Sequence, residues 1–175
     1  MVYKIDYYES DGDNYRYIIG TKGEHTLIAI GVNPNTATDK NPDKTISKTI
    51  EFSIRNGYDS FIAVNLYPQR AKFPKDLDKQ EFQNQIQKNL DKIELIVPKL
   101  KKYDIVCAWG NSILLRPYLQ KSARDIMGIL SKNSGSIFMF GNLTEKGHPR
   151  HLSRLGYSNK PEPFTYSMYL EKLGV

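Results

Sequence analysis

Apolar residues along this chain gather in four short runs, and each run ends in polar residues. The runs cover residues 27–32, 61–66, 104–109 and 136–140. Their β-branched and aromatic members are typical of strands that are buried on both faces. The first run stops at Asn33 and Pro34, and proline cannot donate a hydrogen bond to a strand ladder. The pattern therefore predicts four buried strands, each followed by a polar loop.

A helical pattern follows the first strand, with isoleucines spaced four residues apart. Ile46, Ile50 and Ile54 would share one face of a helix. Asp43 is of the type that caps the first turn, and Gly57 is of the type that follows the last turn. The spacing predicts a helix between these two residues that packs its isoleucine face on the sheet.

A longer helix is predicted after the second strand. Asp78 and Glu81 have the spacing of a capping box, and Pro98 marks the end of the pattern. The residues that would share its apolar face are Phe82, Ile86, Leu90, Ile93 and Val97. Steps of three and four residues predict the longest helix of the chain here.

The second half of the chain predicts two more helices. Pro117 divides the region after the third strand into two pieces. The second piece would bury Ala123, Ile126, Met127 and Leu130. A last helix is predicted over residues 162–173, with Pro161 and Pro163 near its start.

Strands that alternate with helices predict a parallel sheet, because crossover helices connect parallel neighbours. Near the start of the chain, residues 11–14 indicate a turn between two short edge strands, the second at residues 15–19. The expected fold class is α/β: a three-layer αβα sandwich with a central, mostly parallel four-stranded sheet plus an N-terminal edge hairpin. We expect residues 1–175 to form a single α/β domain.

Composition narrows the class of protein. The chain has 175 residues with 25 Lys and Arg against 19 Asp and Glu, a formal net charge of +6. This excess permits a polyanionic partner, but many of the lysines lie on predicted helix faces that contact solvent. Cys107 is the only cysteine, so no disulfide framework is expected. Because no apolar run is long enough to span a membrane, we expect a soluble cytoplasmic protein.

Motifs for common cofactors are absent from the sequence. It has neither the Gly-x-Gly-x-x-Gly of dinucleotide-binding proteins nor the P-loop, and it lacks the Gly-x-Ser-x-Gly elbow of serine hydrolases. His148 and His151 have a spacing compatible with metal binding, with Asp39 or Asp43 as a third ligand. Paired loop histidines more often lie at the surface or make hydrogen bonds, so we expect no cofactor and no metal.

The polar loops are expected to meet at one end of the sheet, because parallel strands all end there. The loops cover residues 33–36, 65–70, 110–112 and 147–154. Open α/β sheets bind their ligands at this end. The basic residues in and beside these loops, which are candidate phosphate contacts, are Arg70, Lys72, Arg150 and Arg154.

Short motifs in and around these loops resemble those of a known family. They are, in order, Asn33-Pro34, Thr36-Ala37, Thr45-Ile46, Asn65-Leu66, Arg70-Ala71, Ala108-Trp109-Gly110 and Gly147-His148-Pro149-Arg150-His151. Together they resemble a prokaryotic and phage family catalogued as a domain of unknown function, DUF 1643. The resemblance covers nearly the whole chain and implies no activity.

A more distant resemblance is to the uracil-DNA glycosylase superfamily. Residues 31–34, Gly-Val-Asn-Pro, are similar to its first motif, Gly-x-Asp/Asn-Pro, and Trp109-Gly110 resembles the Trp-Gly after its third strand. Residues 148–153, His-Pro-Arg-His-Leu-Ser, are similar to its final motif, His-Pro-Ser-Pro-Leu-Ser. Arg150 and His151 depart from that final motif. Asn35 departs from the first, which has an aromatic residue there.

This resemblance implies a role for each matching residue. Asn33 would position the water that attacks a glycosidic bond, and His148 would donate a hydrogen bond to the leaving base. The residues that would bind the base are Asn65, Asn35 and Tyr67. Leu152 would wedge into the duplex. The full set of nucleic-acid contacts would be Arg70, Lys72, Arg150, His151, Leu152 and Arg154. An amide cannot accept a proton from water, so Asn33 would not act as a general base.

Three functions stay open at this point. The first is a base-recognising protein that binds nucleic acid or nucleotides, with hydrolysis of an N-glycosidic bond as its enzymatic form. The second is a non-catalytic module that binds a nucleobase or nucleotide in the same pocket. The third is a structural or protein-interaction domain. The natural ligand and the oligomeric state stay open in each. For the base-binding functions we expect Asn33, Asn65 and His148 to line one cavity.

Overall fold

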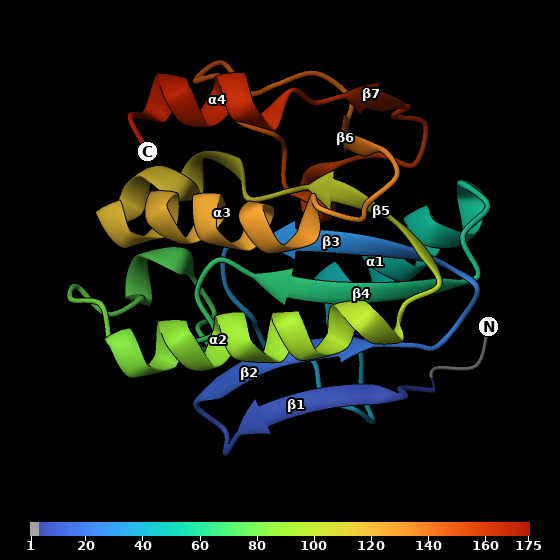
Figure 1. Ribbon diagram of the computed structural model, residues 1–175, viewed down its shortest axis with the longest axis horizontal. Helices are drawn as coiled ribbons and strands as arrows, with labels where there is room; N and C mark the ends of the chain where they lie inside the picture. Colours follow the sequence, from blue (N-terminus) through green and yellow to red (C-terminus); the bar gives the residue numbers. More distant parts are fainter. Residues whose placement is uncertain (1–3) are drawn as a thin grey trace.

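The structure, a computed structural model that describes residues 4–175, is built on a mixed seven-stranded sheet (Figure 1). The strands are β1 (Tyr7–Asp11), β2 (Tyr15–Gly20), β3 (His25–Gly31), β4 (Ser60–Asn65), β5 (Lys102–Cys107), β6 (Ile137–Phe140) and β7 (Pro161–Pro163). Their order across the sheet is β1-β2-β4-β3-β5-β6-β7. The central strands β4, β3, β5 and β6 are parallel, whereas β1, β2 and β7 pair with their neighbours in antiparallel fashion.

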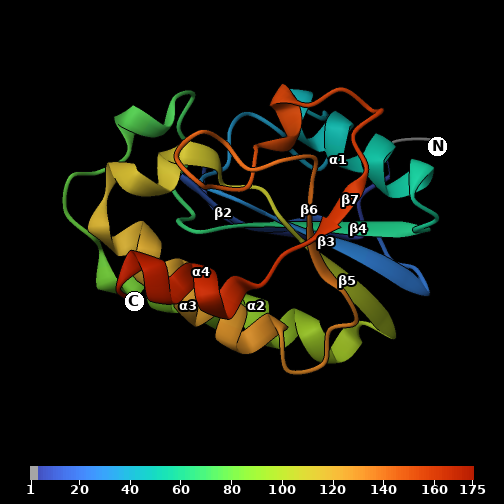
Figure 2. The ribbon, with the colours of Figure 1, turned by 90° about the horizontal axis from the view of Figure 1, so that it is seen from above.

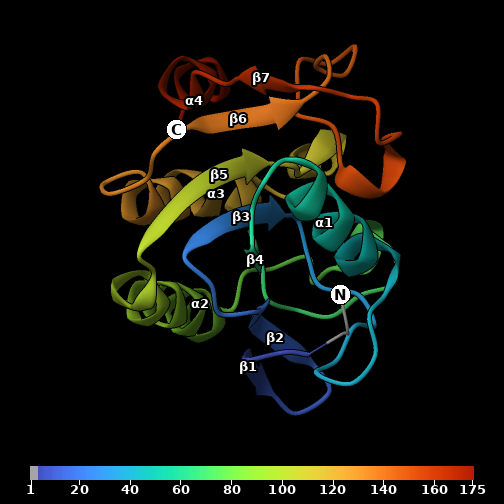
Figure 3. The same ribbon diagram turned by 90° about the vertical axis from the view of Figure 1, so that its right-hand side faces the viewer.

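Helices cover both faces of this sheet (Figure 2). The α-helices are α1 (Lys44–Arg55) on one face and α2 (Gln83–Ile96), α3 (Pro117–Leu130) and α4 (Tyr166–Leu173) on the other. The short 3-10 helices are η1 (Pro74–Asp76), η2 (Val97–Lys99), η3 (Gly110–Leu115) and η4 (Leu152–Arg154). Figure 3 shows β3, β5 and β6 pointing the same way, so their carboxyl ends lie together. Within residues 4–175, no helix has both the length and the apolar composition to cross a bilayer.

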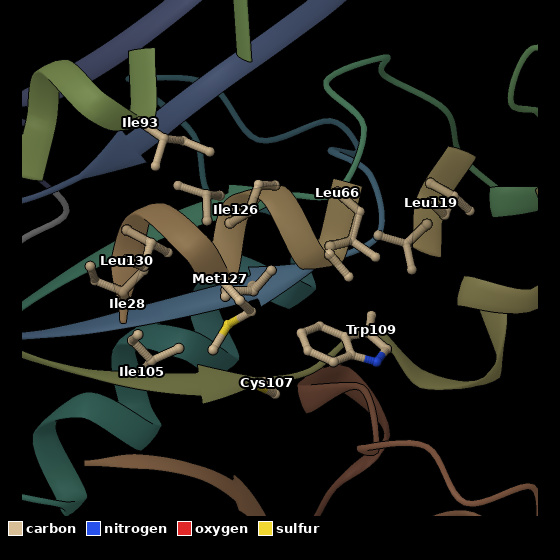
Figure 4. Packing of buried hydrophobic residues seen from close by; sticks show 14 of the residues in the cluster. Ile28, Leu66, Ile93, Ile105, Cys107, Trp109, Leu119, Ile126, Met127 and Leu130 are labelled. Carbon is tan, nitrogen blue, oxygen red and sulfur yellow. The ribbon is translucent and has the colours of Figure 1, made fainter. Parts of the chain in front are cut away.

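The central strands are buried on both faces. Ile28 and Ile105 are fully buried in a cluster with Met127 of α3 (Figure 4). Leu27 belongs to a separate buried cluster that includes Phe52 of α1. Because successive side chains on a strand point to opposite faces, a strand covered on both sides is apolar throughout. This is why the parallel strands appear in the sequence as continuous apolar runs.

Several predicted features of the fold are confirmed. The four apolar runs form β3, β4, β5 and β6, and the N-terminal hairpin forms from β1 and β2. Asp43 caps α1, because its Oδ1 accepts a hydrogen bond from the Ile46 N–H at 2.9 Å. Gly57 follows α1 with a φ of +80°, a conformation that glycine adopts most readily. Pro98 lies just beyond α2, and α3 begins at Pro117.

Two parts of the predicted topology are wrong. The four parallel strands and the edge hairpin form as expected, with β2 between β1 and β4, but the sheet has a seventh strand, β7, that the sequence did not indicate. The last helix does not begin at residue 162. Pro161–Pro163 forms β7 beside β6, and α4 begins at Tyr166. Prolines are tolerated in β7 because it is an edge strand with no outer neighbour to receive a hydrogen bond.

The helix faces also differ from the predicted ones. Ile54 is 43% exposed. The buried residues of α1 are Ile46, Thr49, Phe52 and Ser53. Thr49 and Ser53 are tolerated there because each hydroxyl donates to the carbonyl four residues earlier. No side chain caps α2, so the capping box predicted from Asp78 and Glu81 does not form.

Candidate functional site

A cleft of about 480 Å³ lies where the parallel strands end, which we call the carboxyl end of the sheet. Its walls come from the loops after β3, β4, β5 and β6 and from the start of α1. The basic side chains Lys72, Arg150 and Arg154 line it. Among residues 4–175, no acidic side chain lines it. The four polar loops thus meet around one basic cleft.

The loop after β3 is held in place by the side chain of Asn33. Its Nδ2 donates hydrogen bonds to the carbonyl oxygens of Pro34 at 2.9 Å and Ala71 at 2.8 Å. Both amide hydrogens are used in this way, so Asn33 offers the cleft only Oδ1, a hydrogen-bond acceptor. Asn35 lines the same cleft, and its Oδ1 is buried without a hydrogen-bond partner.

A smaller cavity of about 30 Å³, which we call the inner chamber, adjoins the cleft. The residues that line both are Asn33, Asn35, Thr45 and His151. Further polar residues of the inner chamber are Arg16, Asp43, Thr49 and Asn65. A cavity of this volume has room for about one or two water molecules. The inner chamber can therefore receive the tip of a ligand but not a whole ring.

Asn65 brings an unpaired amide into the inner chamber. The residue ends β4 and is 5% exposed, and its Nδ2 has no hydrogen-bond partner. Gly31, its ladder neighbour on β3, leaves the space open. A Cβ at Gly31 would lie 3.0 Å from Asn65 Oδ1 and 4.0 Å from His151 Nε2. A buried donor without a partner costs about 1–3 kcal/mol, and a ligand that accepts its hydrogen bond recovers that cost.

His151 is held as a neutral donor beside the inner chamber. The N–H of Ser153 donates to its Nδ1 at 3.3 Å, and the Ser153 hydroxyl lies 2.8 Å from the same atom. A backbone N–H can only donate, so Nδ1 is an acceptor and the neutral ring carries its hydrogen on Nε2. Burial lowers the pKa of His151, and the neighbouring Arg154 lowers it further. Nε2 is therefore a hydrogen-bond donor on the side of Gly31 at neutral pH.

His148 lies elsewhere. It is 4% exposed, and its Nδ1 is 2.8 Å from the hydroxyl of Tyr169 on α4, which also accepts a hydrogen bond from Trp109 Nε1 at 2.9 Å. Burial lowers the pKa of His148, with Lys146 as a second cause. His148 lines neither the cleft nor the inner chamber. The expectation that it shares a cavity with Asn33 and Asn65 is therefore wrong, and His151 occupies that position.

Two other predicted ligand contacts are core residues. Tyr67 is fully buried, with its ring centroid 4.8 Å from that of Tyr118, and it lines neither cavity. Leu152 lines only the inner chamber, is 2% exposed and belongs to the same apolar cluster as Phe52. A side chain buried in this way presents nothing to insert into a duplex, so the geometry contradicts the implied wedge.

The four candidate basic residues divide by what they already bind. Arg70 donates to carbonyl oxygens of the loop after β3 at 2.8 and 3.0 Å and therefore supports that loop. Arg150 is exposed, and its Nε donates to a loop carbonyl at 3.0 Å. Lys72 and Arg154 are exposed on the wall of the cleft. The last two are thus the side chains most available to an anionic ligand.

The cleft also contains residues that sequence reasoning did not single out as ligand contacts. The small polar ones are Thr45, Asn111, Ser112, Thr144 and Ser153. Most of them lie in loops that follow strands, which is the signal that could have identified them. Phe73 lines the cleft as well and is 50% exposed. The sequence feature that could have identified Phe73 is its position as an aromatic residue between the basic residues Lys72 and Lys75.

Comparisons with known proteins bear on the family alone. Comparison with curated proteins and with solved structures gave no match. They thus lend no support to the resemblance to the uracil-DNA glycosylase superfamily. As for metals, within residues 4–175 the structure has no group of three or more His, Cys, Asp or Glu side chains that could hold a metal ion. Residues 16–151 do match a family described as protein of unknown function (DUF1643). Because this match spans most of the chain, the protein belongs to the DUF1643 family.

Proposed function

We propose that the cleft binds a nucleotide, either free or as a unit of a nucleic-acid strand, without cleaving it. The observation that carries this proposal is the charge of the cleft, with three basic side chains and no acidic one among the described residues. Lysine and arginine are the side chains that bind phosphate oxygens most strongly. The volume of about 480 Å³ also suits a small ligand, since such sites span roughly 300–1,000 Å³.

The inner chamber offers the proposed ligand a second point of recognition. Asn65, His151 and Asn35 line it, with Asn65 Nδ2 and His151 Nε2 as available donors and Asn35 Oδ1 as an available acceptor. An amide-like group of a base, with one carbonyl oxygen and one N–H, satisfies donors and an acceptor together. In this arrangement the phosphate lies against Lys72 and Arg154, and the polar edge of the base reaches the chamber.

Binding is proposed rather than hydrolysis because the residues implied for cleavage are separated. His148 is hydrogen-bonded to Tyr169 and does not line the cleft, and Leu152 is buried. Asn33 can hold a water through Oδ1 but cannot take its proton. The arrangement therefore supports the non-catalytic form of the function.

Trp109 allows a direct test, because it is the only tryptophan of the chain and lines the cleft. We expect its fluorescence to change on titration with nucleoside monophosphates or with a short single-stranded oligonucleotide. The phosphate-free nucleosides should have much weaker effects, because the phosphate supplies most of the attraction. Saturation by monophosphates alone would identify a free nucleotide as ligand, and saturation by the oligonucleotide alone would identify a strand. No response to any of them would contradict the proposal.

A pair of double variants separates the cleft from general attraction by a basic protein. Lys72→Gln with Arg154→Gln should lower the affinity roughly tenfold or more, because two phosphate contacts are lost. Lys99→Gln with Lys102→Gln removes the same charge, and Lys102 begins β5 at the opposite end of the sheet. This control should keep the wild-type affinity. Equal losses in both variants would count against a site in the cleft.

A further inference from the structure

The basic cleft continues into a second, shallower cavity of about 320 Å³. The two share Asn35, Ala71 and Lys72, so they adjoin along the loop after β4. Arg70 lines the second cavity, together with one acidic residue, Asp13. Basic side chains thus stand in the cleft and at the junction, and Arg70 adds positive charge to the second cavity although its guanidinium already donates to two loop carbonyls and to the Tyr8 hydroxyl. Such a path accommodates successive phosphates better than a single one.

Phe73 stands beside this junction, next to Lys72. Its ring is 50% exposed and lines the cleft. The ammonium groups of Lys72 and Lys75 lie over the ring, 5.5 and 5.6 Å from its centroid, and both side chains are exposed, so a base that stacks on the ring displaces one of them toward a phosphate. An exposed aromatic ring among cations is the arrangement by which proteins bind single strands, with a base on the ring and phosphates on the cations.

We propose that Phe73 is a stacking platform for a base of single-stranded nucleic acid whose phosphates follow the basic path. This inference rests on the proposed function, because the platform needs a cleft that binds phosphate. It narrows that function by naming a single strand as the ligand. A base can stack on Phe73 only when one of its faces is free, as in a single strand and not in the interior of a duplex. Every base has such a face, so the platform is tolerant of sequence.

Fluorescence polarisation with labelled oligonucleotides tests this platform. The ligands are a thymidine dodecamer, an abasic strand of the same length and a blunt duplex of the same length. The wild type should bind the thymidine strand roughly tenfold more tightly than the abasic strand. Phe73→Ala should weaken thymidine binding several-fold and leave abasic binding unchanged, so that the preference falls to what the inner chamber alone supplies, whereas Phe73→Trp should retain the full preference.

Phe82→Ala is the matched control. Phe82 is also 50% exposed, and it lines neither the cleft nor the second cavity. Its removal should leave the affinity for every ligand unchanged. Both phenylalanines are exposed enough that neither variant should fail to fold.

The outcomes distinguish failure of the platform from failure of the proposed function. Equal wild-type affinity for thymidine and abasic strands overturns the platform and leaves phosphate binding in place. The same holds if Phe73→Ala weakens both strands equally, which would mean that Phe73 only shapes the cleft. Tighter binding of the duplex than of the single strand also overturns the platform. If the wild type binds neither single strand nor any nucleoside monophosphate, both proposals fail.

Discussion

The two ends of the parallel strands use polar side chains in opposite ways. At the amino end, Asp104 lies 2.9 Å from His25 Nε2 and accepts hydrogen bonds from the Tyr58 hydroxyl at 2.9 Å and the Ser136 N–H at 2.5 Å. At the carboxyl end, Asn65 Nδ2 is buried and has no partner. One end is thus closed by a network of hydrogen bonds, and the other has a buried donor and a buried acceptor without partners on residues that line a cavity.

Glycines mark both ends, and they show the same difference. A Cβ at Gly135 would collide with Asp104 Oδ1, and one at Gly23 would collide with Asp59 Oδ1, so these glycines let carboxylates reach backbone N–H groups. A Cβ at Gly31 would instead enter the inner chamber. Polar groups that are all paired cross-link the fold, whereas unpaired ones beside a basic cleft can bind a ligand. This difference is why we propose the carboxyl end as the binding end.

The largest expected effect is on stability and lies at the amino end. Asp104→Ala should lower the free energy of unfolding by about 3 kcal/mol, because it leaves the buried Tyr58 hydroxyl and the partly buried donors of His25 and Ser136 without their acceptor. Asn65→Ala should lower it by only about 1 kcal/mol, since its Nδ2 has no partner to lose. Urea unfolding of both variants measures the difference. A loss at Asn65 as large as that at Asp104 would remove the distinction between the two ends.

The pH dependence of stability should also originate at the amino end. Burial raises the pKa of Asp104, but hydrogen bonds from Ser136 N–H, Tyr58 and His25 outweigh burial and hold this pKa below its ordinary value of 3.8. A carboxyl with a lowered pKa stabilises the fold above its unfolded pKa and loses this contribution as pH falls through its folded pKa.

We therefore expect the stability gap between the wild type and Asp104→Asn to be full at neutral pH. The gap should shrink once the pH falls below about 4, where Asp104 of the unfolded wild type takes up a proton, and be smallest below the lowered pKa of the folded state. Urea unfolding of both proteins across this range measures the gap. A gap that stays constant into acid would show that the charge of Asp104 contributes nothing.

At the carboxyl end, a single methyl group should act on binding more than on stability. Gly31→Ala places its Cβ in the inner chamber and should lower the affinity for the bound nucleotide or strand roughly fivefold, equivalent to one lost hydrogen bond. Gly135→Ala at the amino end is the matched variant, and it should lower stability without changing affinity. Ligand titration and urea unfolding of both variants measure affinity and stability. An affinity loss in Gly135→Ala together with a stability loss alone in Gly31→Ala would refute the prediction.

The smallest expected effect is on the salt dependence of binding. Arg154→Gln should reduce the slope of log affinity against log salt concentration by about 1. The variant makes one phosphate contact fewer, so its binding releases one counterion fewer. Lys102→Gln should leave the slope unchanged, since Lys102 begins β5 at the amino end. Titrations at several salt concentrations give both slopes. Equal changes would place the anion outside the cleft.

Local signals in the sequence predicted much of the fold. Apolar runs identified the parallel strands, Asp43 identified the start of α1, and Pro117 that of α3, because each signal acts on its own neighbours in the chain. The places of β2 and β7 in the sheet depend on pairing with distant strands, so no local pattern fixed them. The same limit explains why the predicted sheet had too few strands.

The candidate site was predictable only as a set of loops. Parallel strands bring their loops together whatever the side chains do, so the position of the cleft followed from topology. Which histidine faces the cleft did not, because His148 and His151 are three residues apart in one loop. The backbone of this loop, including Gly147 with a φ of +80°, turns His148 toward Tyr169 and leaves His151 at the cleft. A motif matched by residue type carries no such orientation.

The most direct test of the central claim follows the backbone amide signals of isotope-labelled protein by nuclear magnetic resonance. The ligand is the thymidine dodecamer, with a nucleoside monophosphate as the second ligand. We expect shifts at Gly31, Asn111 and Ser153 and unchanged signals at Gly23 and Gly135. Shifts confined to the latter two, or no shift at either end of the sheet, would contradict it.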